Sequence, residues 1–191
     1  MLFRSQYAGK TLDQIAALQN KSFVDVVIDW GYGGPRVAHF TQDPQIQDVF
    51  VAAPEVAIAS DGAAEMHHPR SYGSNAKIFQ EFVATGRMDL GSAIHKMTGL
   101  PASITGIEDR GLLGAGRKAD IVIFDPRAVR ANASWTDPTR PASGFNYVLV
   151  NGKVALRDDE VVDAHHGRVL RRAPKASTSQ LGLTSPPPEV H

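Results

Sequence analysis

Apolar residues recur at helical spacing in five segments before residue 100. Three of these segments begin with a recognisable N-terminal signal. Thr11 is followed three positions later by Gln14, which is the pattern of a capping box. Ser22 is a candidate N-cap, and Asp43 stands before Pro44, a residue type favoured at the first helical position. We therefore predict helices over residues 9–20, 21–33, 43–53, 74–86 and 90–99.

Each predicted helix has an apolar face that should turn toward a core. Glycines are expected to end the last two helices, Gly86 the fourth and Gly99 the fifth. The residues expected to point inward are Phe23, Val26, Val27 and Trp30 in the second helix, Ile46, Val49 and Phe50 in the third, and Ile78, Phe79, Phe82 and Val83 in the fourth.

The segment between the third and fourth helices has a different pattern. Residues 55–60 read EVAIAS, a short apolar run without alternation, which is typical of a strand buried on both faces. The run stops at Ser60-Asp61-Gly62. We predict a strand over Val56–Ala59 with helices on either side, as in an α/β fold.

From Gly111 onward the pattern changes to short strands. Two apolar runs are joined by Asn151-Gly152, the strongest short-range hairpin signal. The expected antiparallel sheet contains Ala119–Phe124 and Tyr147–Leu156, with residues 167–172 as a candidate edge strand. The chain then divides into a helix-rich part (1–107), a β part (108–172) and a Pro/Ser/Thr-rich tail (173–191) that we predict to be disordered.

Composition narrows the classes of partner. Twenty basic and twenty acidic side chains cancel, so no basic surface for nucleic acid stands out. The chain has no cysteine, which removes disulfides and thiolate metal ligands and is compatible with a reducing cytoplasm. No apolar run approaches membrane-spanning length, and the first residues lack the apolar core of a signal peptide. We expect a cytoplasmic protein with neither a nucleic-acid nor a membrane partner.

Asp61 and Arg70 are the candidate functional side chains. Asp61 comes directly after the predicted buried strand, where barrels and open α/β sheets place their chemistry. The same Ser-Asp-Gly sequence also suits a turn or a helix N-cap. The guanidinium of Arg70 could bind a carboxylate through its fork of donors, or form a surface ion pair.

The paired histidines lack the spacing of a metal site. His67 and His68 are adjacent, so they point in different directions in any regular element, and neither an i, i+4 nor an HxH arrangement is present. We interpret them as loop or surface residues. The second pair, His165 and His166, lies in the β part far from the other candidates, and we assign it no role.

Three segments together resemble the C-terminal part of D-aminoacylases, the N-acyl-D-amino-acid deacylases of the amidohydrolase superfamily. The resemblance runs from Gly9 to Arg172. Residues Lys96–Pro126 are similar to a general amidohydrolase signature, whereas the Ser-Asp-Gly and His-Pro-Arg motifs are similar to the D-aminoacylase branch. The segments are IASDGAAEMHHPRSYGS, AIHKMTGLPASITGIEDRGLLGAGRKADIVIFDP and YVLVNGKVALRDDEVVDAHHGRVLRR.

The resemblance implies a fold, an activity and two site residues. The fold would be the C-terminal portion of a metal-dependent (β/α)₈ barrel followed by strands of a small β-sandwich. Asp61 would be the catalytic proton shuttle beside a bound Zn²⁺, and Arg70 would hold the free carboxylate of an N-acyl-D-amino acid. A zinc-bound water with a pKa near 7 would supply the nucleophile for amide hydrolysis.

Two departures from the family limit what this chain can do alone. The spacing between Asp61 and Arg70 is shorter than is usual in the family. The metal ligands of the family lie upstream of the matched region, and this chain has no HxH motif and no cysteine. A full barrel needs about 250 residues. The sequence therefore predicts a C-terminal fragment that contains no metal site of its own and is inactive alone, with a missing N-terminal half on another chain as a candidate partner.

Two alternatives stay open from the sequence. One is a fragment of a cyclic-amide amidohydrolase, similar to dihydropyrimidinase or hydantoinase, which shares the β-sandwich signature but not the His-Pro-Arg motif. The other is a non-catalytic remnant or interaction module that folds around the β part.

Overall fold

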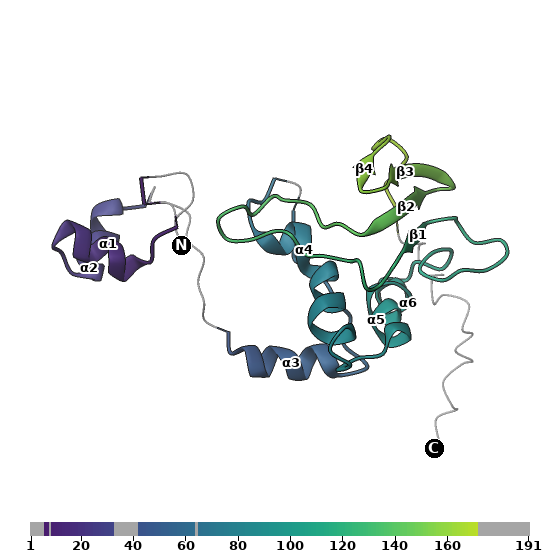
Figure 1. Cartoon of the computed structure of the whole chain (residues 1–191), viewed down its shortest axis with the longest axis horizontal. Helices are drawn as coiled ribbons and strands as arrows, with labels where there is room; N and C mark the ends of the chain where they lie inside the picture. The colour runs from purple at the N-terminus through teal and green to yellow at the C-terminus, as the bar shows by residue number, and fades with distance from the viewer. Residues whose placement is uncertain (1–5, 8, 33–41, 64, 172–191) are drawn as a thin grey trace, which may run out of the picture.

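The computed structural model describes residues 6–7, 9–32, 42–63 and 65–171, so the predicted tail 173–191 lies outside the described residues. Figure 1 shows a helical N-terminal portion and a small sheet toward the C-terminus. The elements are α1 (Leu12–Gln19), α2 (Phe23–Trp30), α3 (Pro44–Ala52), α4 (Pro69–Ile78), the π-helix η1 (Phe79–Val83), α5 (Leu90–Met97), α6 (Gly99–Thr105), β1 (Ile121–Phe124), β2 (Phe145–Val150), β3 (Lys153–Arg157) and β4 (Glu160–Val161).

The predicted caps of the first three helices are confirmed. The amide N of Gln14 donates to Thr11 Oγ1 at 3.4 Å, and the amide N of Thr11 donates to Gln14 Oε1 at 3.0 Å, which completes the capping box. Side-chain oxygens of Ser22 and Asp43 cap α2 and α3, and Pro44 occupies the first position of α3. These signals are local, so the sequence alone was sufficient to place them.

The fourth and fifth predicted helices have different bounds. The fourth begins at Pro69 rather than at residue 74, because His68 caps it and a proline suits its first turn. It continues into the π-helix and stops before Gly86, whose φ of 73° favours glycine, as predicted. Gly99 does not close α5: that helix ends at Met97 with Thr98 as its C-cap, and Gly99 is the first residue of α6.

Burial of the apolar faces follows the prediction only where another element covers them. Val26 is fully buried because α2 packs on Ile15 and Ala16 of α1. Ile78 and Phe82 lie in a second cluster with Met88 and Ala93. The inward orientation is wrong for five residues whose exposure lies between 49% and 68%, since no described element packs over them: Phe23, Val27, Ile46, Val49 and Phe50.

The predicted strand over Val56–Ala59 is not formed. These residues have neither helix nor strand hydrogen bonding, and the barrel expected from the sequence is not observed in the described part of the chain. A strand needs a neighbouring strand for its ladder, and the described ranges contain none beside this segment. Instead of pairing with a strand, the segment contacts the end of α5: the amide N of Ile58 donates to the carbonyl of Lys96 at 2.9 Å.

Lys96 is buried, with 2% of its surface exposed, and its side chain contacts the chain just before this segment. Its Nζ donates to the carbonyl oxygen of Ala53, directly after α3. Burial lowers the pKa of Lys96, and the nearby charge of Glu55 opposes that shift. Lys96 therefore joins α5 to the chain that leads toward Asp61.

The β part is a four-stranded antiparallel sheet with the strand order β1-β2-β3-β4. The predicted hairpin is confirmed, and the turn residues Asn151 and Gly152 both have positive φ, at 52° and 80°. Such values are typical of a type I′ turn. The expected edge strand is not formed by residues 167–171. The short β4 is the edge strand instead and pairs with β3.

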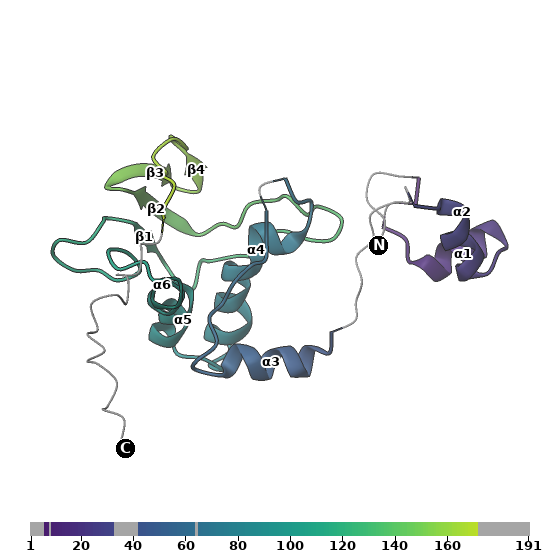
Figure 2. The same cartoon turned by 180° about the vertical axis from the view of Figure 1, so that it is seen from behind.

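The helices and the sheet share a hydrophobic cluster. Val129 is fully buried against Ala76 and Phe79, and the ring of Phe79 meets that of Phe124 edge-on, with centroids 5.1 Å apart. A hydrogen bond also joins the two parts, since the amide N of Ala131 donates to the side-chain oxygen of Gln80 in η1 at 2.7 Å. The sheet is therefore anchored on α4 and η1, whereas α1 and α2 lie apart from them in both views (Figures 1 and 2).

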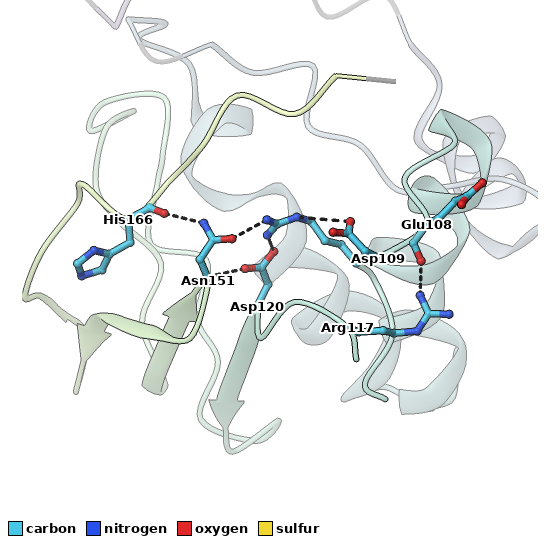
Figure 3. A network of polar contacts seen from close by, with 7 residues as sticks. Glu108, Asp109, Arg117, Asp120, Asn151 and His166 are labelled. Atoms are coloured by element: carbon cyan, nitrogen blue, oxygen red, sulfur yellow. Dashed lines mark hydrogen bonds and ion pairs between the residues drawn. The ribbon is translucent and has the colours of Figure 1, made fainter. Parts of the chain in front are cut away.

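A polar network holds the β-hairpin turn in place (Figure 3). Arg110, only 12% exposed in its side chain, donates to the carboxylate of Asp120 and to Asn151 Oδ1. The amide N of Asn151 donates to Asp120 Oδ1 at 2.8 Å, and Asn151 Nδ2 donates to the carbonyl of His166 at 2.7 Å. Burial acts to raise the pKa of Asp120, but the hydrogen bonds from Asn151 and Arg110 outweigh it and lower that pKa.

Candidate functional site

Asp61 lies in an irregular segment that exposes its side chain. Its φ of 47° is in the left-handed region, which aspartate tolerates better than most residues. Ser60 closes a turn in this segment, because its Oγ accepts a hydrogen bond from the amide N of Gly62 at 3.2 Å. The carboxylate of Asp61 is 87% exposed and is therefore accessible to a ligand. This backbone conformation does not exclude chemistry at the carboxylate.

The turn rests directly on the first turn of α4. A β-carbon placed on Gly62 would lie 2.8 Å from Ser71 Cα and 2.9 Å from Ser71 Oγ. Only glycine allows this approach without a shift of backbone. The Oγ of Ser71 is buried and has no hydrogen-bond partner among the described residues. Close packing of backbone on backbone thus sets the distance between Asp61 and α4.

The structure brings Asp61 and Arg70 together. Arg70 Nη2 lies 3.1 Å from Asp61 Oδ2, so the two residues predicted as site residues form an ion pair. The Arg70 side chain is 38% exposed, but its Nε is buried and has no hydrogen-bond partner within the described ranges. An exposed pair of this kind contributes about 0–1 kcal/mol to stability. What the pair does show is position: a carboxylate lies directly beside a guanidinium.

His68, which we interpreted as a loop or surface residue, lies in the loop before α4 and contacts the candidate site. It is the N-cap of α4, where its Nδ1 accepts a hydrogen bond from the amide N of Arg70 at 3.1 Å. Its ring meets Trp135 edge-on, with centroids 4.8 Å apart. Burial and the positive charge of Arg70 lower the pKa of His68, and Asp61 opposes this shift. A residue placed before Pro at a helix start was the one signal that could have revealed this cap.

The other histidines lie in different surroundings. His67 is exposed, and its Nδ1 lies 3.2 Å from the carbonyl oxygen of Glu65. His165 and His166 both contact Asp163, at 3.0 Å and 3.3 Å. A hydrogen bond from the His165 amide is the main cause that lowers the pKa of Asp163.

An open hollow of about 290 Å³ adjoins the Asp61 turn. This volume is at the lower end of small-molecule sites. Its lining residues come from the turn and from the first turn of α4: Ser60, Gly62, Ala63, Ser71 and Tyr72.

The described residues do not form a metal centre. No group of three or more His, Cys, Asp or Glu side chains that could hold a metal ion occurs in the described ranges. A catalytic zinc ion normally needs three protein ligands and one open position, and Asp61 alone does not meet that requirement. Nor does any helix within the same ranges have the length and apolar character needed to cross a membrane.

Comparison with known proteins identifies the family of the chain. Residues 11–156 match the model of the Amidohydrolase family. The chain is similar to the D-aminoacylase of Alcaligenes xylosoxydans xylosoxydans, with 35% identity over 170 residues that cover 87% of this chain and 35% of that protein. It is also similar to the N-acyl-D-glutamate deacylase of the same organism, with 39% identity over 119 residues, covering 60% of this chain and 24% of the relative.

Solved structures show the same relationship in three dimensions. A crystal structure of D-aminoacylase superposes with a TM-score of 0.76 at 34% identity, covering 84% of this chain and 34% of that one. The N-acyl-D-glutamate deacylase of Bordetella bronchiseptica superposes with a TM-score of 0.75 at 31% identity, covering 85% and 34%. That enzyme was solved with zinc and a phosphonate inhibitor that mimics the tetrahedral intermediate.

The chain belongs to the amidohydrolase family, and the resemblance to its D-aminoacylase branch is confirmed. It spans about a third of the length of the D-aminoacylases it matches. Two of the relatives are named as deacylases of N-acyl-D-glutamate and N-acyl-D-aspartate, and the zinc in one solved structure agrees with the metal dependence that the resemblance implied.

Proposed function

We propose that this chain carries the proton-transfer carboxylate and the substrate-carboxylate clamp of an N-acyl-D-amino-acid deacylase. The reaction would convert an N-acyl-D-amino acid and water into a D-amino acid and a carboxylate. The observation that carries the proposal is the 3.1 Å pair between Asp61 and Arg70 at the start of α4. The names of the relatives supply the substrate class.

Asp61 has the properties required of a proton shuttle. Its carboxylate is exposed and acceptor-only when ionised, and the turn on α4 fixes its position. It can take a proton from the attacking water and return it to the amine that leaves. General acid–base help of this kind contributes about 10²- to 10⁴-fold to a rate.

Arg70 has donors left for a second carboxylate. The pair with Asp61 uses Nη2, whereas a guanidinium carries five N–H donors in a fixed fork. A substrate carboxylate bound at the exposed part of this guanidinium would also meet the partial positive charge of the α4 N-terminus. Binding there would place the scissile amide near Asp61.

The chain supplies only part of a complete catalytic site. The described residues contain no metal-ligand cluster, so the steps assigned to them are proton transfer and substrate binding. We place residues 1–107 as the last units of a (β/α)₈ barrel and residues 108–172 as strands of the small β-sandwich. The remaining part of the barrel, on this polypeptide or on a partner chain, would complete it. A cytoplasmic location belongs to the same proposal.

A fusion experiment tests the proposal. The chain is joined to the N-terminal part of a related deacylase, and hydrolysis of an N-acetyl-D-amino acid is compared with and without Asp61→Asn, which keeps the shape and removes the base. We expect an active fusion that loses about 10²-fold or more in kcat with the variant. An active fusion with equal activity in the variant would show that Asp61 is only a turn residue. A folded but inactive fusion would favour a non-catalytic remnant.

A further inference from the structure

His68 connects the candidate substrate clamp to the β part. Its Nδ1 accepts the amide proton of Arg70 at 3.1 Å, while its ring packs edge-on against Trp135. Trp135 belongs to the connection between β1 and β2, so the side chain of His68 contacts two regions that are far apart in sequence. The hydrogen bond joins the ring to the residue whose guanidinium meets Asp61.

The hydrogen bond fixes the chemical state of the ring. A backbone amide can only donate, so Nδ1 of His68 must be unprotonated to accept from Arg70. The ring is then neutral and carries its proton on Nε2. Protonation of Nδ1 would set two donors against each other and free the first turn of α4.

We propose that His68 is a positioning residue for Arg70: its neutral ring, packed against Trp135, holds the first turn of α4 so that the guanidinium meets Asp61. The inference rests on the proposed function only for the ligand of Arg70, a substrate carboxylate. The geometry of the cap and of the ring contact stands without it.

An ordinary helix cap is the competing interpretation. Ser22 caps α2 in the same manner, with its Oγ accepting from the amide of Asp25 at 3.1 Å. Loss of that cap should lower stability without moving any site residue. A positioning residue must in addition change the environment of the Arg70 guanidinium, and this difference is measurable.

NMR of the full chain provides the first test, because the buried Nε–H of Arg70 is a reporter of guanidinium position. His68→Leu removes the acceptor at similar volume, whereas His68→Asn keeps a capping oxygen. We expect the Leu variant to shift the Arg70 Nε–H resonance and to speed its hydrogen exchange about fivefold, and the Asn variant to stay close to the parent. Ser22→Ala is the matched control and should leave this resonance unchanged. An unchanged resonance in the Leu variant, or an equal change in the Ser22 control, would overturn the proposal.

The active fusion provides the second test. His68→Leu should raise KM about tenfold for an N-acetyl-D-amino acid, with kcat and the KM for the corresponding amide unchanged, and His68→Asn should restore most of the affinity. An equal effect on both substrates, or no rescue by Asn, would contradict a positioning role. An inactive parent fusion would instead count against the proposed function, and the NMR result would still decide the role of His68.

Discussion

Gly62 lies so close to Ser71 that the turn bearing Asp61 and the helix bearing Arg70 touch through their backbones. A β-carbon on Gly62 would come within 2.8 Å of Ser71 Cα, closer than real contacts of this kind. The backbone φ at position 62 does not itself require glycine, since it does not lie in the left-handed region. The requirement is steric, and the distance between Asp61 and Arg70 depends on it.

Gly62→Ala should therefore separate the two site residues. The added methyl group must push the turn away from α4, which we expect to cost about 1–3 kcal/mol of unfolding free energy, as overpacking does. Urea unfolding would measure this cost. Gly167→Ala is the matched control, because nothing lies within 4 Å of a β-carbon there. Equal stability of the two variants would show that the turn moves freely on α4.

The fork of Arg70 should matter for substrates with a free carboxylate. In an active fusion, Arg70→Lys keeps the charge but loses the planar pair of donors. We expect KM for an N-acetyl-D-amino acid to rise about tenfold or more, because a charge-assisted hydrogen bond is lost. The KM for the corresponding amide should stay unchanged. A parallel rise for both substrates would mean that Arg70 supports the fold rather than the ligand.

Stability should fall as His68 becomes protonated. The pKa of His68 in the folded chain is lowered by burial and by Arg70, against the opposing charge of Asp61. A group with a lowered folded pKa contributes stability that is present above its unfolded value, about 6.5, and is lost as pH falls toward the folded value. Urea unfolding from pH 7.5 to 5 should show this loss in the parent and a smaller one in His68→Asn. Identical pH profiles would contradict the prediction.

Local signals made the caps and the hairpin predictable from the sequence. Thr11 with Gln14, and Asn151 with Gly152, act within a few residues, so no knowledge of the rest of the fold was needed. The prediction of a strand over Val56–Ala59 was wrong because a strand forms only beside a neighbouring strand, which local signals do not reveal. The prediction that the apolar face of α3 is buried was wrong for the same reason. Periodicity identifies an apolar face, but only a covering element buries it.

The two charged residues of the candidate site could be predicted from the sequence, whereas the contacts that hold them in place could not. The resemblance named Asp61 and Arg70, and the structure places them 3.1 Å apart. The sequence indicated only a loop or surface residue at His68, because its ring contacts Trp135, which lies far along the chain and reaches it only through the fold. The contact of Gly62 with Ser71 likewise has no signature in the sequence.

Arg110 should be the main support of the hairpin turn. Arg110→Met keeps much of the length of the side chain but removes the donors to Asp120 and Asn151. The variant removes charge-assisted hydrogen bonds from the Asp120 carboxylate, whose side chain is 34% exposed, so we expect a loss of about 1 kcal/mol in unfolding free energy at pH 7.

The pH dependence gives a second readout. The lowered pKa of Asp120 contributes stability above its unfolded value, and this contribution is lost on acidification through the folded value. Arg110→Met should therefore lose less stability than the parent as pH falls below 4. Arg117→Met is the control, since Arg117 is exposed and donates to the carbonyl of Glu108. A control as unstable as Arg110→Met would rule out a specific role of the network.

The purified chain should not retain zinc. Three protein ligands are the norm for a catalytic zinc ion, and the described residues bring no such group together around Asp61. We expect far less than one zinc per chain after dialysis, by elemental analysis, and the same content in Asp61→Asn. Hydrolysis of N-acetyl-D-amino acids by the chain alone should stay at background, because proton transfer by Asp61 contributes only about 10²- to 10⁴-fold. One zinc per chain that survives dialysis in the parent and is lost in Asp61→Asn would contradict this expectation, and would make Asp61 a metal ligand with His67 and His68 as its first candidate neighbours.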